Sequence, residues 1–203
     1  MGIRGWNSLL APVAAGDRVI EAVRSWVRER SPQAPHLEQT LAWTMELEPS
    51  ASEEVQIAAL SHDMERAFPE GSPKWEADRG WNDPLYDTAH AERSARVVGD
   101  FLRDAGWPES KVREVVRLIL AHEKGGWHEA DVVQAADSLS FLETMARPVA
   151  RWVFEGRASA DQARARIDHA VQRIHHPKAR EIADGMLPRA MQDFEEELAG
   201  GGA

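Results

Sequence analysis

The sequence contains no cysteine among its 203 residues, and this absence limits the chemistry that the chain can carry. Disulfide bonds are excluded, and so are metal sites built from thiolates. A chain without disulfides is compatible with a reducing compartment. We therefore expect a cytoplasmic protein, and we expect any metal ligands to be histidine and carboxylate side chains.

The chain also lacks an excess of basic residues and a long apolar run. It carries 24 Lys and Arg against 34 Asp and Glu, a formal net charge of -10. Binding to a phosphate backbone needs a basic surface, so nucleic acid is not an expected partner. No apolar stretch is long enough to cross a bilayer, and residues 9–15 lack a signal-peptide pattern, so a membrane is not expected either.

The spacing of apolar residues is helical throughout. Val19, Val23 and Val27 recur every four residues, and no segment alternates with the period of a strand. The chain length suits one domain, so we predict a single all-α domain over 1–203. Residues 67–86 are predicted to form a long loop of the kind that often serves as a lid. The predicted helices span about 14–29, 35–45, 52–66, 86–105, 109–123, 129–145, 148–155, 160–175 and 178–198.

Four histidines and two aspartates stand out because most of them fall on the apolar faces of these predicted helices. They are His36, His62, Asp63, His90, His122 and Asp137. Burying a lone carboxylate is costly, and neither Asp63 nor Asp137 has a basic residue beside it on its own stripe. A metal would supply the missing positive charge, and imidazoles would bind it too. One such histidine alone is more often a core or capping residue, but the set of six predicts a two-metal centre.

The other four histidines are not expected to bind metal, because they lie on polar stretches: His128, His169, His175 and His176. The eight tryptophans are expected mostly in packing, and the ones that could border the site are Trp75, Trp81 and Trp127.

The order of the six residues resembles the HD-domain metal-dependent phosphohydrolase superfamily, in its binuclear form. The resemblance covers about residues 35–145, and an HD dipeptide alone would be weak support. The segments that carry it are Pro35-His36-Leu37, Ala59-Leu60-Ser61-His62-Asp63, Thr88-Ala89-His90-Ala91, Leu120-Ala121-His122-Glu123 and Ala136-Asp137-Ser138-Leu139-Ser140. It implies an HD-domain helical bundle, to which 146–198 would add helices that cover the core or form a homodimer face.

The resemblance also implies which residue binds which metal. His36, His62, Asp63 and Asp137 would bind the first ion, and Asp63 would bridge to a second ion held by His90 and His122. Mn²⁺ or Fe²⁺ suits such a set of imidazoles and carboxylates, and Zn²⁺, Co²⁺ and Ni²⁺ are also compatible with it.

Several charged residues near the predicted ligands are candidates for the reaction itself. Arg66 keeps a cation where many binuclear members have lysine, so Arg66, Arg93 and Lys124 are the predicted phosphate contacts. Asp63, Arg66 and Glu65 are the predicted catalytic residues. Glu65 and Glu123 would serve in proton transfer, and Asp87 would orient a ligand histidine or a water.

The predicted function is hydrolysis of a small phosphate ester or nucleotide, through a bridging hydroxide on the two-metal site. Two alternatives stay open from the sequence. One is an HD-type diiron oxygenase that uses the same six ligands. The other is a metal-stabilised binding or regulatory protein without turnover, for which a closed coordination sphere would be expected.

Overall fold

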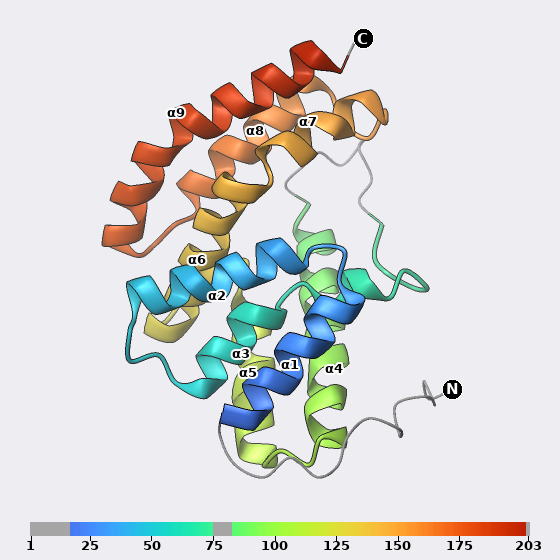
Figure 1. Cartoon of the computed structure of the whole chain (residues 1–203), viewed down its shortest axis with the longest axis vertical. Helices are drawn as coiled ribbons and strands as arrows, with labels where there is room; N and C mark the ends of the chain where they lie inside the picture. Colours follow the sequence, from blue (N-terminus) through green and yellow to red (C-terminus); the bar gives the residue numbers. More distant parts are fainter. Residues whose placement is uncertain (1–16, 75–82, 202–203) are drawn as a thin grey trace.

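The structure is a computed structural model that describes residues 17–74 and 83–201. Within these residues it contains helices and no strand, which confirms the all-α prediction. Figure 1 shows the arrangement. The helices are α1 (Asp17–Arg30), α2 (Ala34–Leu47), α3 (Glu53–Ser61), the 3-10 turn η1 (Met64–Ala67), α4 (Pro84–Asp104), α5 (Glu109–Ala121), α6 (His128–Thr144), α7 (Ala146–Phe154), α8 (Ala160–Gln172) and α9 (Pro177–Gly200).

The helix predicted over 52–66 is shorter than expected. It begins where predicted, because the Ser52 hydroxyl accepts a hydrogen bond from the Val55 amide. It ends at Ser61, however, and the chain continues through a turn into η1. His62 and Asp63 therefore lie in the turn after α3 rather than within a helix.

The predicted loop over 67–86 is also shorter, because α4 begins at Pro84. The Asp83 carboxylate accepts a hydrogen bond from the Leu85 amide, and proline is favoured in the first turn. Residues 75–82, with Trp75 and Trp81, lie outside the described residues, so the predicted lid stays a prediction.

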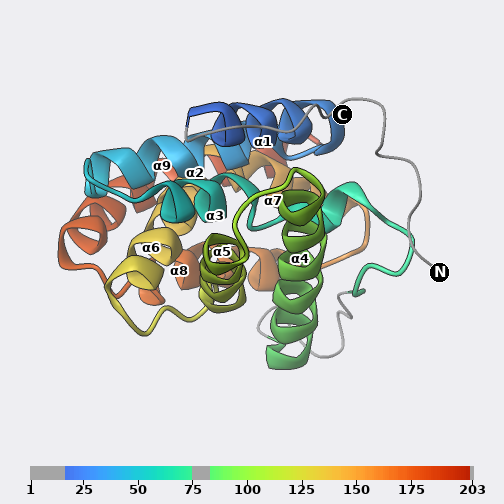
Figure 2. The same ribbon diagram turned by 90° about the horizontal axis from the view of Figure 1, so that it is seen from below.

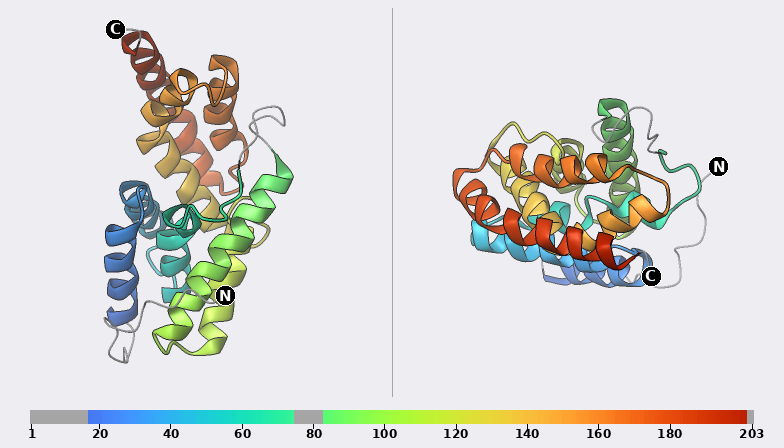
Figure 3. Two further views of the ribbon diagram at one scale, coloured as in Figure 1. Left: turned by 90° about the vertical axis from the view of Figure 1, so that its right-hand side faces the viewer. Right: turned by 90° about the horizontal axis from the view of Figure 1, so that it is seen from above.

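Two hydrophobic clusters form the interior. The first is built from α1 to α5 and the beginning of α6. The second is built from the end of α2, the rest of α6, and α7, α8 and α9. The two groups of helices are stacked in the left view of Figure 3. Helix α6 belongs to both clusters, because Val133 packs in the first and Ala135 in the second. Asp137 lies just after this change.

Helix α3 is the central element of the first cluster. It packs against α1, α2, α5 and α6, and Figure 2 shows it between α2 and α5. Its residues from Ile57 to Leu60 are fully buried, as expected for a helix that is apolar on most faces. The turn that follows α3 therefore starts from a rigid position inside the protein. None of the described helices has an apolar stretch long enough to traverse a lipid bilayer.

Candidate metal centre

The structure brings together all six residues that the sequence singles out. His36 comes from α2, His62 and Asp63 from the turn after α3, and His90 from α4. His122 follows the last residue of α5, and Asp137 comes from α6. All six are buried, and none has more than 7% of its surface exposed.

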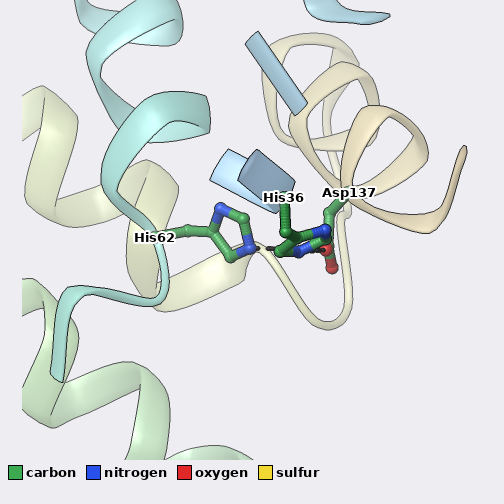
Figure 4. A group of neighbouring side chains, drawn as sticks. All are labelled: His36, His62 and Asp137. Atoms are coloured by element: carbon green, nitrogen blue, oxygen red, sulfur yellow. Dashed lines mark ion pairs between the residues drawn. The ribbon is translucent and has the colours of Figure 1, made fainter. Parts of the chain in front are cut away.

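One group of ligand atoms joins α2, α3 and α6. Asp137 Oδ1 lies 3.1 Å from His36 Nε2 and 3.3 Å from His62 Nε2. Figure 4 shows the two imidazoles and the carboxylate turned toward one point. The three ligand atoms lie within 4.8 Å of one another, a spacing at which they could hold a metal ion.

Asp63 lies between this group and the remaining histidines. Its Oδ1 is 2.8 Å from His90 Nε2, 3.8 Å from His62 Nε2 and 4.0 Å from His122 Nε2. His62, Asp63 and His122 form a second group of possible ligands, and His90, His122 and Glu123 form a third. One carboxylate oxygen thus faces three imidazoles, as a bridging ligand would.

The same local arrangement orients His62 and His122. Each follows the last residue of a helix, and its Nδ1 lies close to the carbonyl oxygen three residues earlier. The distances are 3.0 Å from His62 Nδ1 to Ala59 O and 2.7 Å from His122 Nδ1 to Ile119 O. A carbonyl can only accept, so Nδ1 carries the proton in both rings. The lone pair is then on Nε2, which faces the cluster.

The other two histidines are held at Nδ1 by side chains. His90 Nδ1 lies 3.0 Å from Glu65 Oε1, and His36 Nδ1 lies 2.8 Å from Ser140 Oγ. Ser140 Oγ donates to the His36 carbonyl, so it accepts from the ring. Partners at Nδ1 are typical of metal-binding histidines, because they fix the ring and its tautomer.

The inward-facing nitrogens fit a metal. The Nε2 atoms of His62, His90 and His122 are buried and have no hydrogen-bond partner among the described residues. A lone pair on His90 Nε2 would face Asp63 Oδ1 at 2.8 Å, which is repulsive unless a proton or a cation lies between them. The buried histidines and aspartates could therefore hold a metal ion.

The charges within the cluster raise the pKa of two of its histidines and lower the pKa of Asp63. Burial would lower the pKa of His90, but Asp63 outweighs burial and raises that pKa to about 9. Burial likewise opposes protonation of His62, yet Asp137 and Asp63 raise its pKa. Burial would raise the pKa of Asp63, but Arg66 and the histidines hold it well below its usual range. Without metal, a proton is therefore favoured between His90 Nε2 and Asp63 Oδ1.

A cleft opens beside the cluster. Its empty space, counted together with the open solvent at its mouth, is about 960 Å³. Four carboxylates reach it: Asp63, Asp87, Glu123 and Asp137. The other lining residues are Gln33, His36, Arg66, Tyr86, Phe141, Met145, Trp152, Arg157, Ala158, Gln162, Ala163, Arg166 and His169.

Of the three cations predicted to contact phosphate, only Arg66 lines the cleft. Arg66 Nε donates to Asp63 Oδ2 at 2.8 Å, and its Nη1 lies 2.9 Å from the Tyr86 hydroxyl. Arg93 instead donates to the carbonyls of Phe68 and Glu70, and it is not among the lining residues. Lys124 is exposed on the turn after α5 and does not line the cleft either. Arg93 and Lys124 therefore do not face the cleft, contrary to the phosphate contacts predicted for them.

The predicted acid–base residues are also divided by the structure. Glu65 lies behind His90, held by Ser72 Oγ at 2.6 Å, and does not line the cleft. It orients a histidine rather than facing a substrate. Asp87 and Glu123 do line the cleft, and burial followed by repulsion from Glu123 raises the pKa of Asp87. No hydrogen bond joins the Asp87 carboxylate to His90 among the described contacts.

The sequence analysis missed the contribution of the C-terminal helices. Arg173, which caps α8, donates to Asp137 Oδ2 and Glu123 Oε2, and to Ser138 Oγ at 2.8 Å. Gln162, Arg166 and His169 of α8 line the cleft. The spacing of 162, 166, 169 and 173 is that of one helix face, and this signal was available in the sequence. Trp152 also lines the cleft, whereas Trp127 does not.

Comparisons with known proteins bear on the fold. No protein-family model matches the chain, and no curated protein matches it. The chain is similar to Bacillus subtilis YpgQ, a protein of known crystal structure. The sequence identity is 20% and the TM-score is 0.56. The match covers 87% of this chain and 92% of that chain. This likeness shows a shared helical fold, within which this chain carries a buried cluster of histidines and aspartates able to hold a metal ion.

Proposed function

We propose that this protein is an HD-type metal-dependent phosphohydrolase that acts on a small phosphate ester or nucleotide. The observation that carries the proposal is the set of buried Nε2 atoms of His62, His90 and His122, which have no hydrogen-bond partner among the described residues and lie around Asp63 Oδ1. Packing alone does not explain four carboxylates beside such a set. A pair of divalent cations would satisfy both.

The residues present fit two ions that share Asp63. His36, His62, Asp63 and Asp137 would hold one, and His90, His122 and Asp63 would hold the other, with Glu123 near enough to His122 to join it, at 3.4 Å. When bound, two such cations lower the pKa of water and neutralise charge on a transferred phosphoryl group. Manganese or iron suits the donor set best.

The protein groups around this centre supply positioning. Arg66 and Arg173 hold the outer oxygens of Asp63 and Asp137, which leaves one oxygen of each for a cation. Asp87 lines the cleft with a raised pKa and no ion pair among the described residues. A carboxyl group of this kind is suited to deliver a proton to a leaving oxygen.

The test combines metal analysis with turnover. Untreated protein is expected to contain manganese or iron, and it should release phosphate from an aryl phosphate or a nucleotide panel in the presence of Mn²⁺ or Fe²⁺. His62→Ala and Asp63→Ala should lower turnover by more than about a hundredfold, because several kcal/mol of stabilisation are lost. His128→Ala is the matched control, because the His128 side chain is 64% exposed and, among the residues that the structure describes, pairs with Glu48 alone.

Two results would contradict the proposal. One is a pure, folded protein that gives no turnover with any divalent metal. The other is iron-loaded protein that consumes O₂ and shows a coupled-spin EPR signal after partial oxidation, which would favour the oxygenase alternative.

A further inference from the structure

One cation in the cleft, Arg166, forms no ion pair within the described part of the chain. Arg166 projects from α8 and lines the cleft, and no carboxylate of the described residues forms an ion pair with it. Its Nη1 is buried and has no hydrogen-bond partner. Buried guanidinium nitrogens are normally paired, so an unpaired one beside a reaction centre points to a missing anion.

The position of the Arg166 side chain is fixed without such an anion. Its guanidinium lies over the Phe141 ring, with 4.4 Å from Cζ to the ring centroid. A stack of this kind holds the planar group in one orientation and leaves its N–H edge free. Arg166 is therefore already arranged to bind a ligand.

Its electrostatic surroundings also favour an anion. Three carboxylates attract Arg166. Glu123 and Asp137 are bound by Arg173, and Asp87 forms no ion pair with Arg166 among the described residues. Burial and the repulsion from Arg173 lower the pKa of Arg166, which means that they destabilise its charged form. A bound anion would stabilise that form. Divalent cations at Asp63 and Asp137 would neutralise the remaining negative charge and make the cleft more positive.

Part of the cleft wall is apolar. Phe141, Met145 and Trp152 come from α6, from the residue that joins α6 to α7, and from α7, and all three line the same cleft as Arg166. Apolar side chains beside an oriented cation are a usual composition of a small-molecule site.

We propose that Arg166 binds an oxyanion of the phosphorylated substrate and that Phe141, Met145 and Trp152 receive its organic part. The identification of the ligand as a substrate rests on the proposed function. The anion site itself does not depend on that function. Helices α7 and α8 then have a defined role, because they supply Trp152 and Arg166 for recognition, while α2 to α6 supply the cluster.

The experiment uses Arg166→Gln in the full chain with Mn²⁺ present. Inorganic phosphate is the probe, and its affinity is measured by calorimetry, so the readout does not depend on turnover. We expect the dissociation constant to rise about ten- to hundredfold, because charge-assisted hydrogen bonds to one anion are lost. Arg166→Lys should recover part of the affinity.

Arg164→Gln is the matched control. Arg164 lies on the same helix and loses the same charge, but its guanidinium pairs with Glu195 at 2.6 Å and with Asp161 at 3.1 Å on the surface. Phosphate affinity in this variant should equal that of the unmodified protein. The inference is overturned if Arg166→Gln binds phosphate normally, if Arg164→Gln weakens binding equally, or if the unmodified protein does not bind phosphate.

Trp152→Ala tests the apolar wall. It should weaken phenyl phosphate more than inorganic phosphate, and an equal effect on both would remove the organic part of the inference. The two proposals can fail separately. If the protein lacks metal or turnover but its phosphate affinity still depends on Arg166, only the hydrolase proposal is contradicted. If turnover depends on metal but is unchanged in Arg166→Gln, only the anion site is contradicted.

Discussion

The Asp137 carboxylate is divided between Arg173 and the histidine cluster. Arg173 Nη2 donates to Asp137 Oδ2, while Oδ1 of the same side chain faces His36 Nε2 at 3.1 Å and His62 Nε2 at 3.3 Å. One oxygen is thus held by an arginine and the other is directed to the imidazoles. Asp63 is divided in the same way, with Oδ2 bound by Arg66 and Oδ1 facing His90.

Arg173→Met should therefore release Asp137. Breaking a buried ion pair leaves an uncompensated charge, so we expect the free energy of unfolding to fall by about 3 kcal/mol in metal-free protein. Metal content after dialysis should fall as well, because Asp137 is no longer held in one orientation. Chemical denaturation and elemental analysis measure the two effects.

Arg180→Met is the control for this change. Arg180 is 43% exposed and pairs with Asp184 one turn away, so its loss should have little effect on stability. Arg173→Lys should not fully restore the metal content, because lysine lacks the forked donors that reach Asp137 and Glu123 together. Unchanged stability and metal content in Arg173→Met would refute the assignment.

Glu65→Gln should weaken metal binding without touching the cleft. Glu65 Oε1 lies 3.0 Å from His90 Nδ1, and an amide binds that proton less strongly than a carboxylate does. Loss of such a partner typically costs about ten- to a hundredfold in metal affinity. A titration of metal-free protein with Mn²⁺ measures this, with the exposed Glu70→Gln as control. Normal metal affinity combined with lost turnover would instead support the proton-transfer role predicted from the sequence.

Removal of metal with EDTA should lower the midpoint of thermal unfolding. A ligand that binds only the folded state stabilises it, by about 2.7 kcal/mol at a hundred times its dissociation constant. Added Mn²⁺ should restore the midpoint. In His62→Ala the EDTA effect should be much smaller, because His62 belongs to two of the possible ligand groups. A midpoint that EDTA does not change in the unmodified protein would argue against a bound metal.

The metal-free protein should lose stability as the pH rises from neutral to alkaline. The pKa of His90 is raised to about 9 in the folded protein, and a group with a raised pKa stabilises the fold fully below its unfolded pKa of about 6.5. That contribution is lost as the pH rises through about 9, a difference of roughly 3 kcal/mol. Urea unfolding in EDTA at about pH 6 and about pH 10 measures it.

Asp63→Asn is the control for the pH effect. Asp63 is the strongest of the groups that raise the pKa of His90, so the loss of stability should be smaller in this variant. The depressed pKa of Asp63 acts in a different window, since its contribution is lost only as the pH falls below about 3.9. Equal stability of the unmodified protein at both alkaline and near-neutral pH would show that His90 is not protonated in the cluster.

Much of the architecture could be predicted from the sequence because its causes are local. Apolar spacing gave the helices, and the end of α3 was misplaced because His62 bonds back to the Ala59 carbonyl and closes the last turn. The same closure recurs at His122. Capping of this kind depends on side-chain rotamers, which periodicity does not report.

The sequence by itself determined the helical class, from apolar spacing, and the identity of the six clustered residues, from their order, which resembles a known family, and from the apolar faces on which most of them lie. Only the tertiary structure decided which partners complete them. Arg173 reaches Asp137 across 36 positions of the chain, Glu65 reaches His90 across 25, and Arg166 stacks on Phe141 from a different helix. Electrostatic pairing depends on distance in space, and that distance is set by how α6 and α8 pack.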